Sequence, residues 1–188
     1  MTLALRYAVR SDVGLLSEGN EDSAYAGPHL LAVADGLGGS AGAEVASAVA
    51  IMTLAALDDE LQAADRVGAL ADTVAEANMR LRELITADPA LQGMGTTLTA
   101  MLWSDGRAAL RHIGHSRAYR LCDGQFLQIT HDHTVAQALA DKGKISADEV
   151  ATHPKASLLL RVLEGGTVAE PDLMPLARWQ ATATCCAP

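Results

Sequence analysis

The sequence predicts an α+β protein in which helices cover antiparallel sheets. Two groups of strand-like segments with turn signals flank a pair of long helical stretches, which is the pattern of this class. Composition agrees, because 188 residues of which 49% are hydrophobic can bury a core within one domain. That hydrophobic share is also too high for a disordered chain.

The first 35 residues predict a strand, a loop and a hairpin. Residues 3–9 alternate loosely between apolar and polar side chains, which favours an opening strand. Residues 10–22 are polar and contain glycine, so we expect a loop there. Residues 24–35 predict a hairpin whose turn is Gly27-Pro28.

Two long helices are predicted next. Alanine-rich sequence over 43–57 has apolar residues at helical spacing, namely Val45, Val49, Met52 and Ala56. A second helix over 65–86 carries its own apolar stripe, which comprises Val67, Leu70, Val74, Ala77, Leu81 and Leu84. Asp88-Pro89 ends this helix, because proline cannot continue it.

Four consecutive strands follow the helices. They are expected over 93–103, 107–113, 117–121 and 125–130. Asp105-Gly106 and Asp123-Gly124 are typical hairpin turns, so the four strands should form an antiparallel meander.

Beyond Asp132 the pattern becomes helical again. Short helices are predicted over 134–142 and 146–152, the second with a capping box formed by Ser146 and Glu149. The apolar segment 156–163 is compatible with either type of element.

The net charge limits the kinds of partner that the protein can bind, and the cysteine content indicates its cellular compartment. A net charge of -9 argues against nucleic acid or an anionic membrane as partner. We expect no signal peptide and no stretch apolar enough to span a bilayer. Three cysteines give no disulfide framework, so the sequence predicts a cytoplasmic protein.

The segment from Leu30 to Gly39 is the centre of the functional argument. An apolar run leads into Asp35, and three glycines follow within four residues, so Asp35 lies where a buried strand ends. It could cap the following helix, or it could bind a hard divalent cation that prefers oxygen ligands. The second acidic spot, Asn20-Glu21-Asp22, favours the cation, because Asp22 and Asp35 could meet at one sheet end.

Five motifs in series resemble the metal-dependent (PPM-type) protein serine/threonine phosphatases of bacteria. They are Asn20-Glu21-Asp22, the segment Val33 to Gly39, the segment Gly93 to Thr99, the segment His112 to Arg120, and the segment Ile129 to Thr134. The resemblance implies an α-β-β-α sandwich, two antiparallel sheets flanked by helices. It also implies a binuclear Mn²⁺ or Mg²⁺ centre and hydrolysis of phosphoserine and phosphothreonine in proteins.

The resemblance also assigns roles to individual residues. Asp35 would bridge both metals and the Gly36 carbonyl would bind one of them. Glu21 and Asp22 would hold metal-bound waters. Thr96 and Thr97 look structural, whereas His131 and His133 are expected in a solvated loop. Phosphorylated proteins are the implied partners, together with a Ser/Thr kinase system that acts on the same targets.

The sequence departs from the family pattern at two positions near this centre. Ser17 stands where the family carries an arginine that clamps phosphate, and a hydroxyl cannot supply a bidentate charged fork. His115 replaces an aspartate that serves a further metal site. Imidazole is a poor ligand for Mg²⁺, so that site should be lost or changed in metal preference.

The end of the chain is the third departure. We expect residues 1–178 to form an incomplete phosphatase domain without the family's last strands and aspartates, and residues 179–188 to be an unrelated tail. One possible codon set from Gln180, read in another frame, encodes Gly-Asp-Arg-Tyr-Leu-Leu-Cys-Ser, which resembles the family strand. A frameshift near Arg178 is therefore our hypothesis. Activity should be impaired; the alternatives are a non-catalytic regulatory binder or a nonfunctional gene fragment.

Overall fold

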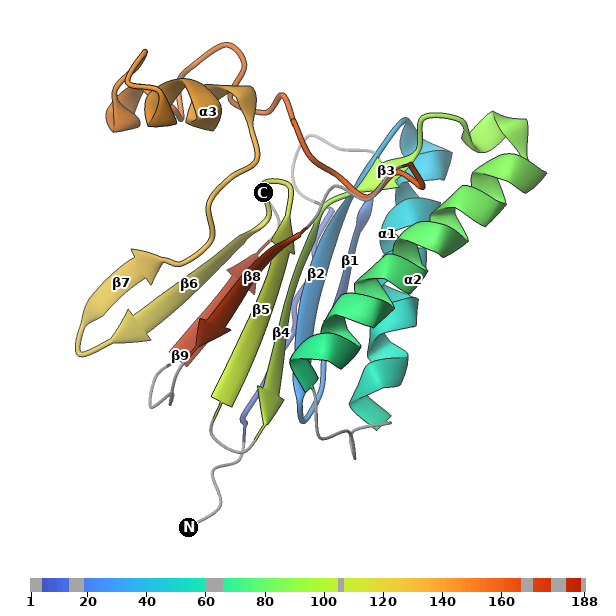
Figure 1. Ribbon diagram of the computed structural model, residues 1–188, viewed down its shortest axis with the longest axis horizontal. Helices are drawn as coiled ribbons and strands as arrows, with labels where there is room; N and C mark the ends of the chain where they lie inside the picture. The colour runs from blue at the N-terminus through green and yellow to red at the C-terminus, as the bar shows by residue number, and fades with distance from the viewer. Residues whose placement is uncertain are drawn as a thin grey trace.

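The computed structural model describes residues 5–13, 19–59, 66–104, 107–166, 171–176 and 182–186 (Figure 1). Two antiparallel sheets pack against each other as a sandwich, and a pair of long helices covers the outer face of the larger sheet. The α+β class and the antiparallel sandwich are confirmed. In the part of the chain that is described, long helices cover one outer face only.

The larger sheet is built around the predicted hairpin. β1 (Asp22–Ala26) pairs with β2 (Leu30–Leu37), and β2 also pairs with β4 (Leu98–Ser104) and with the short β3 (Gly95–Thr96). Alternate residues of β2 are buried, so one face of this strand lies on the core. Residues 5–13 contain no strand, so the expected opening strand is wrong over 5–9.

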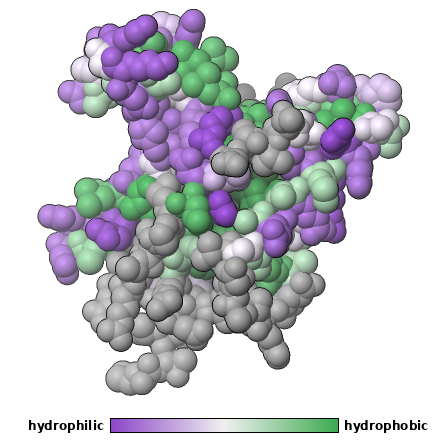
Figure 2. Space-filling model, viewed as in Figure 1, coloured by the Kyte–Doolittle hydropathy of each residue, from purple (hydrophilic) through white to green (hydrophobic). Residues whose placement is uncertain are grey.

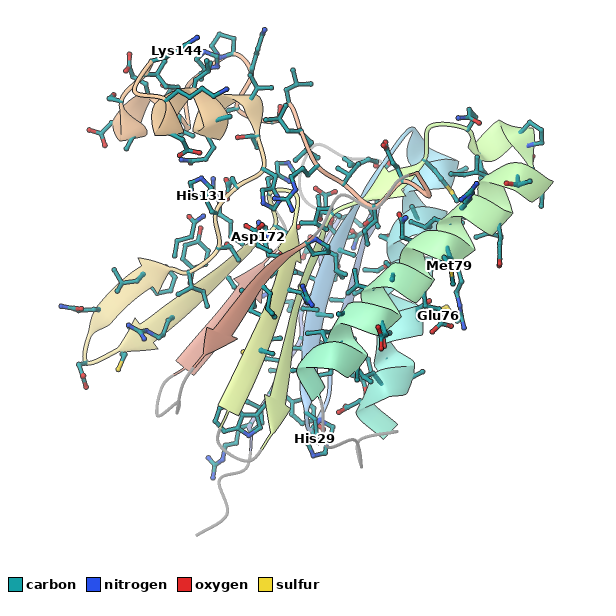
Figure 3. The ribbon with its side chains drawn as sticks, viewed as in Figure 1. His29, Glu76, Met79, His131, Lys144 and Asp172 are labelled. Carbon is teal, nitrogen blue, oxygen red and sulfur yellow. The ribbon has the colours of Figure 1, made fainter. Side chains whose placement is uncertain are left out.

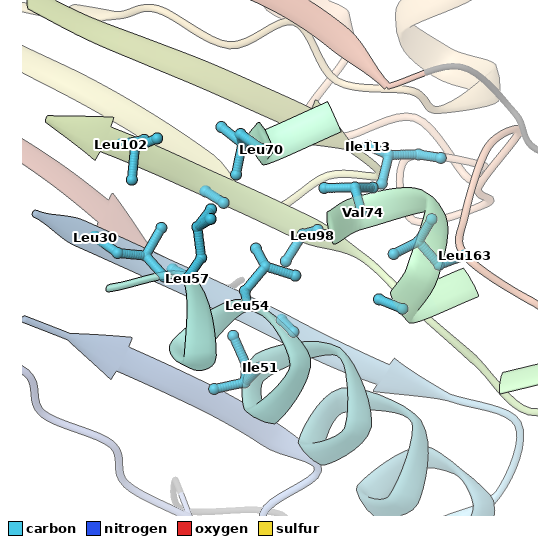
Figure 4. Packing of buried hydrophobic residues seen from close by; sticks show 14 of the residues in the cluster. Leu30, Ile51, Leu54, Leu57, Leu70, Val74, Leu98, Leu102, Ile113 and Leu163 are labelled. Atoms are coloured by element: carbon cyan, nitrogen blue, oxygen red, sulfur yellow. The ribbon is translucent and has the colours of Figure 1, made fainter. Parts of the chain in front are cut away.

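The two long helices pack on that buried face. α1 (Ser40–Asp59) and α2 (Arg66–Ala87) cover the sheet as predicted (Figure 1). The α2 stripe is correct where it is described, since Leu70, Val74, Ala77 and Leu81 are buried. All four belong to the main core together with Leu30, Leu54 and Leu98, and Figure 4 shows Leu70 and Val74 in this cluster.

The predicted stripe of α1 is wrong at two of its four positions, Met52 and Ala56. Met52 is 73% exposed, and Ala56 is also exposed. The buried face instead carries Ala46, Ala50 and Leu54. Ile51 and Leu57 are buried on the same face. Val45 and Val49 are partly buried and pack against the main core, so the predicted stripe is correct at these two positions.

α1 also corrects the expectation about membrane spans. Its segment Ala41–Asp58 is long and apolar enough, by length and composition, to cross a bilayer. Just over half of that segment is buried inside the protein, where it packs on β2 and α2. Its apolar residues therefore build the core, as in many helices of globular proteins.

The four strands predicted as one meander belong to two sheets. β4 pairs with β5 (Arg107–Ile113), and β6 (Arg117–Cys122) pairs with β7 (Gln125–Gln128), but β5 and β6 do not pair with each other. Gly114 separates them with a φ of 103°, and a Cβ there would lie 2.6 Å from the Thr97 Cβ. This bend carries the chain from the larger sheet to the smaller one.

The later strands close both sheets. β8 (Asp172–Leu176) pairs with β5, and β9 (Thr182–Cys186) pairs with β6. A second core lies between the sheets, where Met101 and Leu110 meet Ala118. Hydrophobic residues gather on the surface of the β6–β7 hairpin (Figure 2), where Phe126 is 61% exposed.

The segment between β7 and β8 lies beyond the strand ends (Figure 1). It contains α3 (Val135–Asp141), which confirms the helix predicted over 134–142, and Thr134 is its N-cap. The second helix is only a 3-10 turn, η2 (Ala147–Glu149), although its capping box is present. A similar turn, η1 (Pro89–Leu91), follows α2. The apolar segment 156–163 is irregular and is fixed by bridges from Leu159 and Leu163.

Candidate active site

The carboxylates of Asp22 and Asp35 meet where β1 and β2 pair. The two residues are direct cross-strand partners, as the sequence predicted. Such partners have Cβ atoms about 5 Å apart, so their side chains interact. The Asp35 side chain is only 20% exposed, and Glu21 immediately precedes β1. The result is an acidic centre at one end of the larger sheet.

This proximity changes the ionisation of both aspartates. Burial raises the pKa of Asp35 to about 6, and the charges of Asp22 and Glu21 add to the shift. The pKa of Asp22 is raised mainly by burial and also by Glu21, although its hydrogen bond with Asp35 opposes this. A bound cation would relieve both effects, because it favours the charged carboxylates.

Buried hydroxyls fix the backbone of Asp35. Its N–H donates to the Thr97 Oγ1 at 3.0 Å, and its carbonyl accepts from the Thr96 Oγ1 at 3.0 Å. The Thr97 hydroxyl also lies 2.7 Å from the hydroxyl of Ser116. The prediction that Thr96 and Thr97 are structural agrees with these contacts. Ser116 lies within the motif from His112 to Arg120, but the sequence predicted no role for its side chain.

A second set of contacts fixes Glu21 against β2. Its carbonyl accepts from the Gly36 N–H at 3.1 Å and from the Ser47 Oγ at 2.6 Å. A Cβ at position 36 would lie 2.1 Å from the Ala43 carbonyl oxygen, so only glycine fits. The sequence analysis did not predict a role for Ser47. A polar serine within an alanine-rich helix is the signal that could have indicated one.

His115 lies beside Asp35. Its Nδ1 is 3.9 Å from the Asp35 Oδ2, and its side chain is 15% exposed. That Nδ1 is buried and has no hydrogen-bond partner among the residues that the structure describes. Burial lowers the pKa of His115, so its imidazole is neutral near neutral pH. Ser17, the other altered family position, lies outside the described residues.

The expectation that His133 lies in a solvated loop is wrong. Its side chain is 7% exposed, and its ring stacks on His112 with centroids 4.9 Å apart. Its Nδ1 accepts from the Gly114 N–H, and its Nε2 lies 3.1 Å from an Asp172 oxygen. His131 does lie on the surface, as predicted, with 55% of its side chain exposed. Figure 3 shows His131 and Asp172 near one end of the strands, whereas His29 lies at the other.

An ion pair holds the chain just beyond His115. The Arg117 guanidinium donates from Nε and Nη2 to both oxygens of Asp132, whose side chain is 4% exposed. Gln128 donates to the same carboxylate at 3.0 Å. Bidentate geometry of this kind fixes direction as well as distance. It therefore fixes β6 relative to the loop that leads to α3.

The donor set suits a hard cation that keeps several waters. Asp35 offers a carboxylate, Gly36 a carbonyl, and Glu21 and Asp22 lie close by. Mg²⁺ and similar cations are commonly bound by one or two carboxylates plus water. Within the described ranges, no three His, Cys, Asp or Glu side chains form a metal-binding group. These residues therefore fit a water-rich cation and do not by themselves complete a two-metal site.

A helix-covered antiparallel sandwich with an acidic centre at its end is the architecture of metal-dependent protein phosphatases. Comparison with known sequences identifies the class independently, because residues 20–151 match the family described as protein phosphatase 2C. The chain belongs to the protein phosphatase 2C family.

Relatives and solved structures agree with this assignment. The chain is 49% identical over 173 residues to the serine/threonine protein phosphatase PstP of Mycobacterium tuberculosis, an alignment that covers 92% of this chain and 34% of that protein. A crystal structure of that phosphatase superposes with a TM-score of 0.93 at 47% identity, over 98% of this chain and 79% of the other. A structure of the PstP catalytic domain in complex with two manganese ions gives a TM-score of 0.88 at 45% identity, over 96% and 76%.

A more distant relative is the serine/threonine phosphatase stp of Listeria innocua. It is 31% identical over 163 residues, which cover 82% of this chain and 65% of that protein. The chain thus spans about a third of the length of PstP and just under two thirds of the length of stp.

Proposed function

We propose that this protein hydrolyses phosphoserine and phosphothreonine in other proteins, in a reaction that requires Mn²⁺ or Mg²⁺. The observation that carries the proposal is the Asp22–Asp35 carboxylate pair at the end of β1 and β2, in a chain of the protein phosphatase 2C family. The manganese in the PstP structure supports the choice of cation.

Asp35 and the Gly36 carbonyl would hold the cation directly, and Glu21 and Asp22 would hold it through water. When bound, a divalent cation lowers the pKa of water and neutralises charge on phosphoryl oxygens. Thr96 and Thr97 keep Asp35 in place through its backbone. The Asp22 carboxylate, the cross-strand neighbour of Asp35, would accept a proton from the attacking water.

A non-catalytic binder is the second candidate. It is favoured by the lack of a third metal-binding side chain beside Asp35 in the part of the chain that is described. Such a protein would bind phosphorylated proteins without hydrolysing them. A phosphopeptide titration distinguishes the two, because only the enzyme releases inorganic phosphate.

The test is metal-dependent phosphate release from an aryl phosphate and from a phosphothreonine peptide. We expect turnover that needs Mn²⁺ and falls at least a hundredfold in Asp35→Asn. Asp72→Asn, an exposed carboxylate on α2, is the matched control and should keep full activity. Turnover that persists in Asp35→Asn would contradict the assignment. Peptide binding without turnover would favour the binder.

We propose the same cellular setting that the sequence predicted. Substrates would be phosphorylated proteins, supplied by a Ser/Thr kinase that acts on the same targets, and the protein would act in the cytoplasm. A net charge of -9 supports protein partners over nucleic acid or anionic lipid.

A further inference from the structure

The Nδ1 of His115 is a buried nitrogen that lies beside the acidic centre. His115 follows Gly114, in the bend where the chain leaves β5 for β6, and its Nδ1 is buried. Among the described residues this nitrogen makes no hydrogen bond. It lies 3.9 Å from the Asp35 Oδ2, which is too far for a hydrogen bond.

That separation matches two ligands of one metal ion. Nitrogen and oxygen ligands lie about 2.1 Å from a small divalent cation, so two ligands of one ion are at most about 4.2 Å apart. The 3.9 Å between Nδ1 and Oδ2 falls within this limit. A cation between them would satisfy the buried nitrogen and the buried carboxylate together.

We propose that His115 Nδ1 is a direct ligand of the divalent cation held by Asp35, and that this nitrogen makes the site prefer Mn²⁺ and other transition metals to Mg²⁺. The proposal rests on the proposed function, since it concerns the same cation. Imidazole suits transition metals, whereas Mg²⁺ prefers oxygen. With two side chains as ligands, the Gly36 carbonyl and water complete the coordination sphere.

Hydrogen bonds of the two flanking residues fix the backbone on either side of His115. Gly114, its neighbour, donates its N–H to the His133 Nδ1 at 3.1 Å and accepts from the His133 N–H at 2.8 Å. On the other side, Ser116 contacts Thr97, which in turn binds Asp35. Both flanking residues are therefore fixed by buried hydrogen bonds, so His115 is presented to Asp35 from a rigid bend.

The decisive experiment is pulsed electron paramagnetic resonance of Mn²⁺ bound to the full chain. Mn²⁺ ligated by imidazole shows a nitrogen hyperfine coupling, which Mn²⁺ ligated only by oxygen lacks. We expect this coupling in the unsubstituted protein, its loss in His115→Ala, and its retention in His131→Ala. His131 is the matched control, because it is an exposed imidazole at the same end of the strands.

Affinity provides a second readout that does not depend on activity. Titration of Mn²⁺ should show binding about tenfold or more weaker in His115→Ala. His115→Asp replaces nitrogen with oxygen, so it should retain Mn²⁺ binding but lower the preference for Mn²⁺ over Mg²⁺ at least tenfold. Circular dichroism of each variant confirms that it is folded before binding is compared.

The possible failures are distinguishable. Mn²⁺ that binds without a nitrogen coupling in the unsubstituted protein would overturn the role of His115 and leave the carboxylate site intact. Mn²⁺ that does not bind at millimolar concentration would overturn both this inference and the proposed metal-dependent function. An unchanged Mn²⁺ to Mg²⁺ preference in His115→Asp would also overturn the inference.

Discussion

Burial of the Asp35 carboxyl carries a cost in stability at neutral pH. Its carboxyl is mostly buried beside Asp22, and its pKa is raised to about 6 from an ordinary value of 3.8. The folded protein therefore binds the Asp35 proton more tightly than the unfolded chain does. The stabilisation that results is present below about pH 4 and is lost as pH rises through about 6.

This linkage predicts how Asp35→Asn changes stability without metal. The shift corresponds to about 3 kcal/mol, so Asp35 should make the metal-free protein progressively less stable between about pH 4 and pH 7. Asp35→Asn cannot ionise, so its free energy of unfolding relative to the unsubstituted protein should rise over that range. Urea unfolding in the presence of a chelator measures both proteins.

Asp72→Asn serves as the control in that experiment. Its free energy of unfolding should follow the unsubstituted protein at every pH, because Asp72 is exposed on α2. Parallel pH curves for Asp35→Asn and the unsubstituted protein would show that the Asp35 carboxyl is not perturbed.

At the residue scale, the sequence located the acidic centre but not its supports. An apolar run that ends in an aspartate marks a strand end, and this is enough to bring Asp22 and Asp35 together. The hydroxyls of Ser47 and Ser116 were missed because their partners, the Glu21 carbonyl and the Thr97 hydroxyl, are distant in sequence. His133 was misjudged because its loop is covered by Arg161 and Asp172 from later segments.

Among the elements, β6 is fixed against the loop that leads to α3 by the Arg117–Asp132 ion pair. Asp132 is buried, and it receives hydrogen bonds from Arg117 and Gln128. Arg117→Ala would leave this carboxylate buried and largely uncompensated. Since Arg117 is itself 41% exposed, we expect a loss of about 2–3 kcal/mol of unfolding free energy, below the value for a fully buried pair.

A double-mutant cycle with Asp132→Asn measures this interaction directly. The two substitutions should be strongly non-additive, because either one already removes the charge pair. Arg80→Ala, which removes an exposed pair with Glu76 on α2, should cost less than about 1 kcal/mol. Additive effects of Arg117→Ala and Asp132→Asn would refute the coupling.

The structure and the sequence pattern disagree about which residues of α1 are buried, and two substitutions distinguish them. Leu54 is fully buried against the sheet, whereas Met52 is 73% exposed. Leu54→Ala should therefore lower the unfolding free energy by about 3–5 kcal/mol, and Met52→Ala by less than about 0.5 kcal/mol. Thermal and urea unfolding check both values. A large loss of unfolding free energy in Met52→Ala would instead support the apolar face of α1 that the sequence predicted, which includes Met52.

Strand and helix positions and the partners within each hairpin were largely predictable, but the pairing of β5 with β6 was wrong. Local alternation and Asp-Gly turns place most of the strands, and α2 was correct on its buried face. The single meander failed because two strands that follow each other along the chain need not pair. Only the bend at Gly114, with its positive φ, shows that β5 and β6 belong to different sheets.

Over the whole molecule, the two sheets and their two cores form the frame that holds the acidic centre. One core lies between the long helices and the larger sheet, and the other lies between the sheets. The acidic centre lies at an end of this frame, fixed by β1, β2 and the β3–β4 segment. Family resemblance predicted this arrangement; composition and periodicity alone predicted only its class.

The interpretation of residues 179–188 as a frameshifted tail stays a prediction. Residues 182–186 form β9 on the edge of β6. The nucleotide sequence beyond codon 178 tests the hypothesis. Phosphatase-like sequence in another frame would support it, and its absence from every frame would refute it.

The central claim is that Asp35 lies at the end of β2 to bind a divalent cation. Anomalous X-ray diffraction from crystals soaked in Mn²⁺ tests it most directly. We predict a manganese peak within about 2.5 Å of an Asp35 carboxylate oxygen, with Glu21 and Asp22 facing its waters. An Asp35 carboxylate that only caps α1, with no manganese beside it at saturating concentration, would contradict the account.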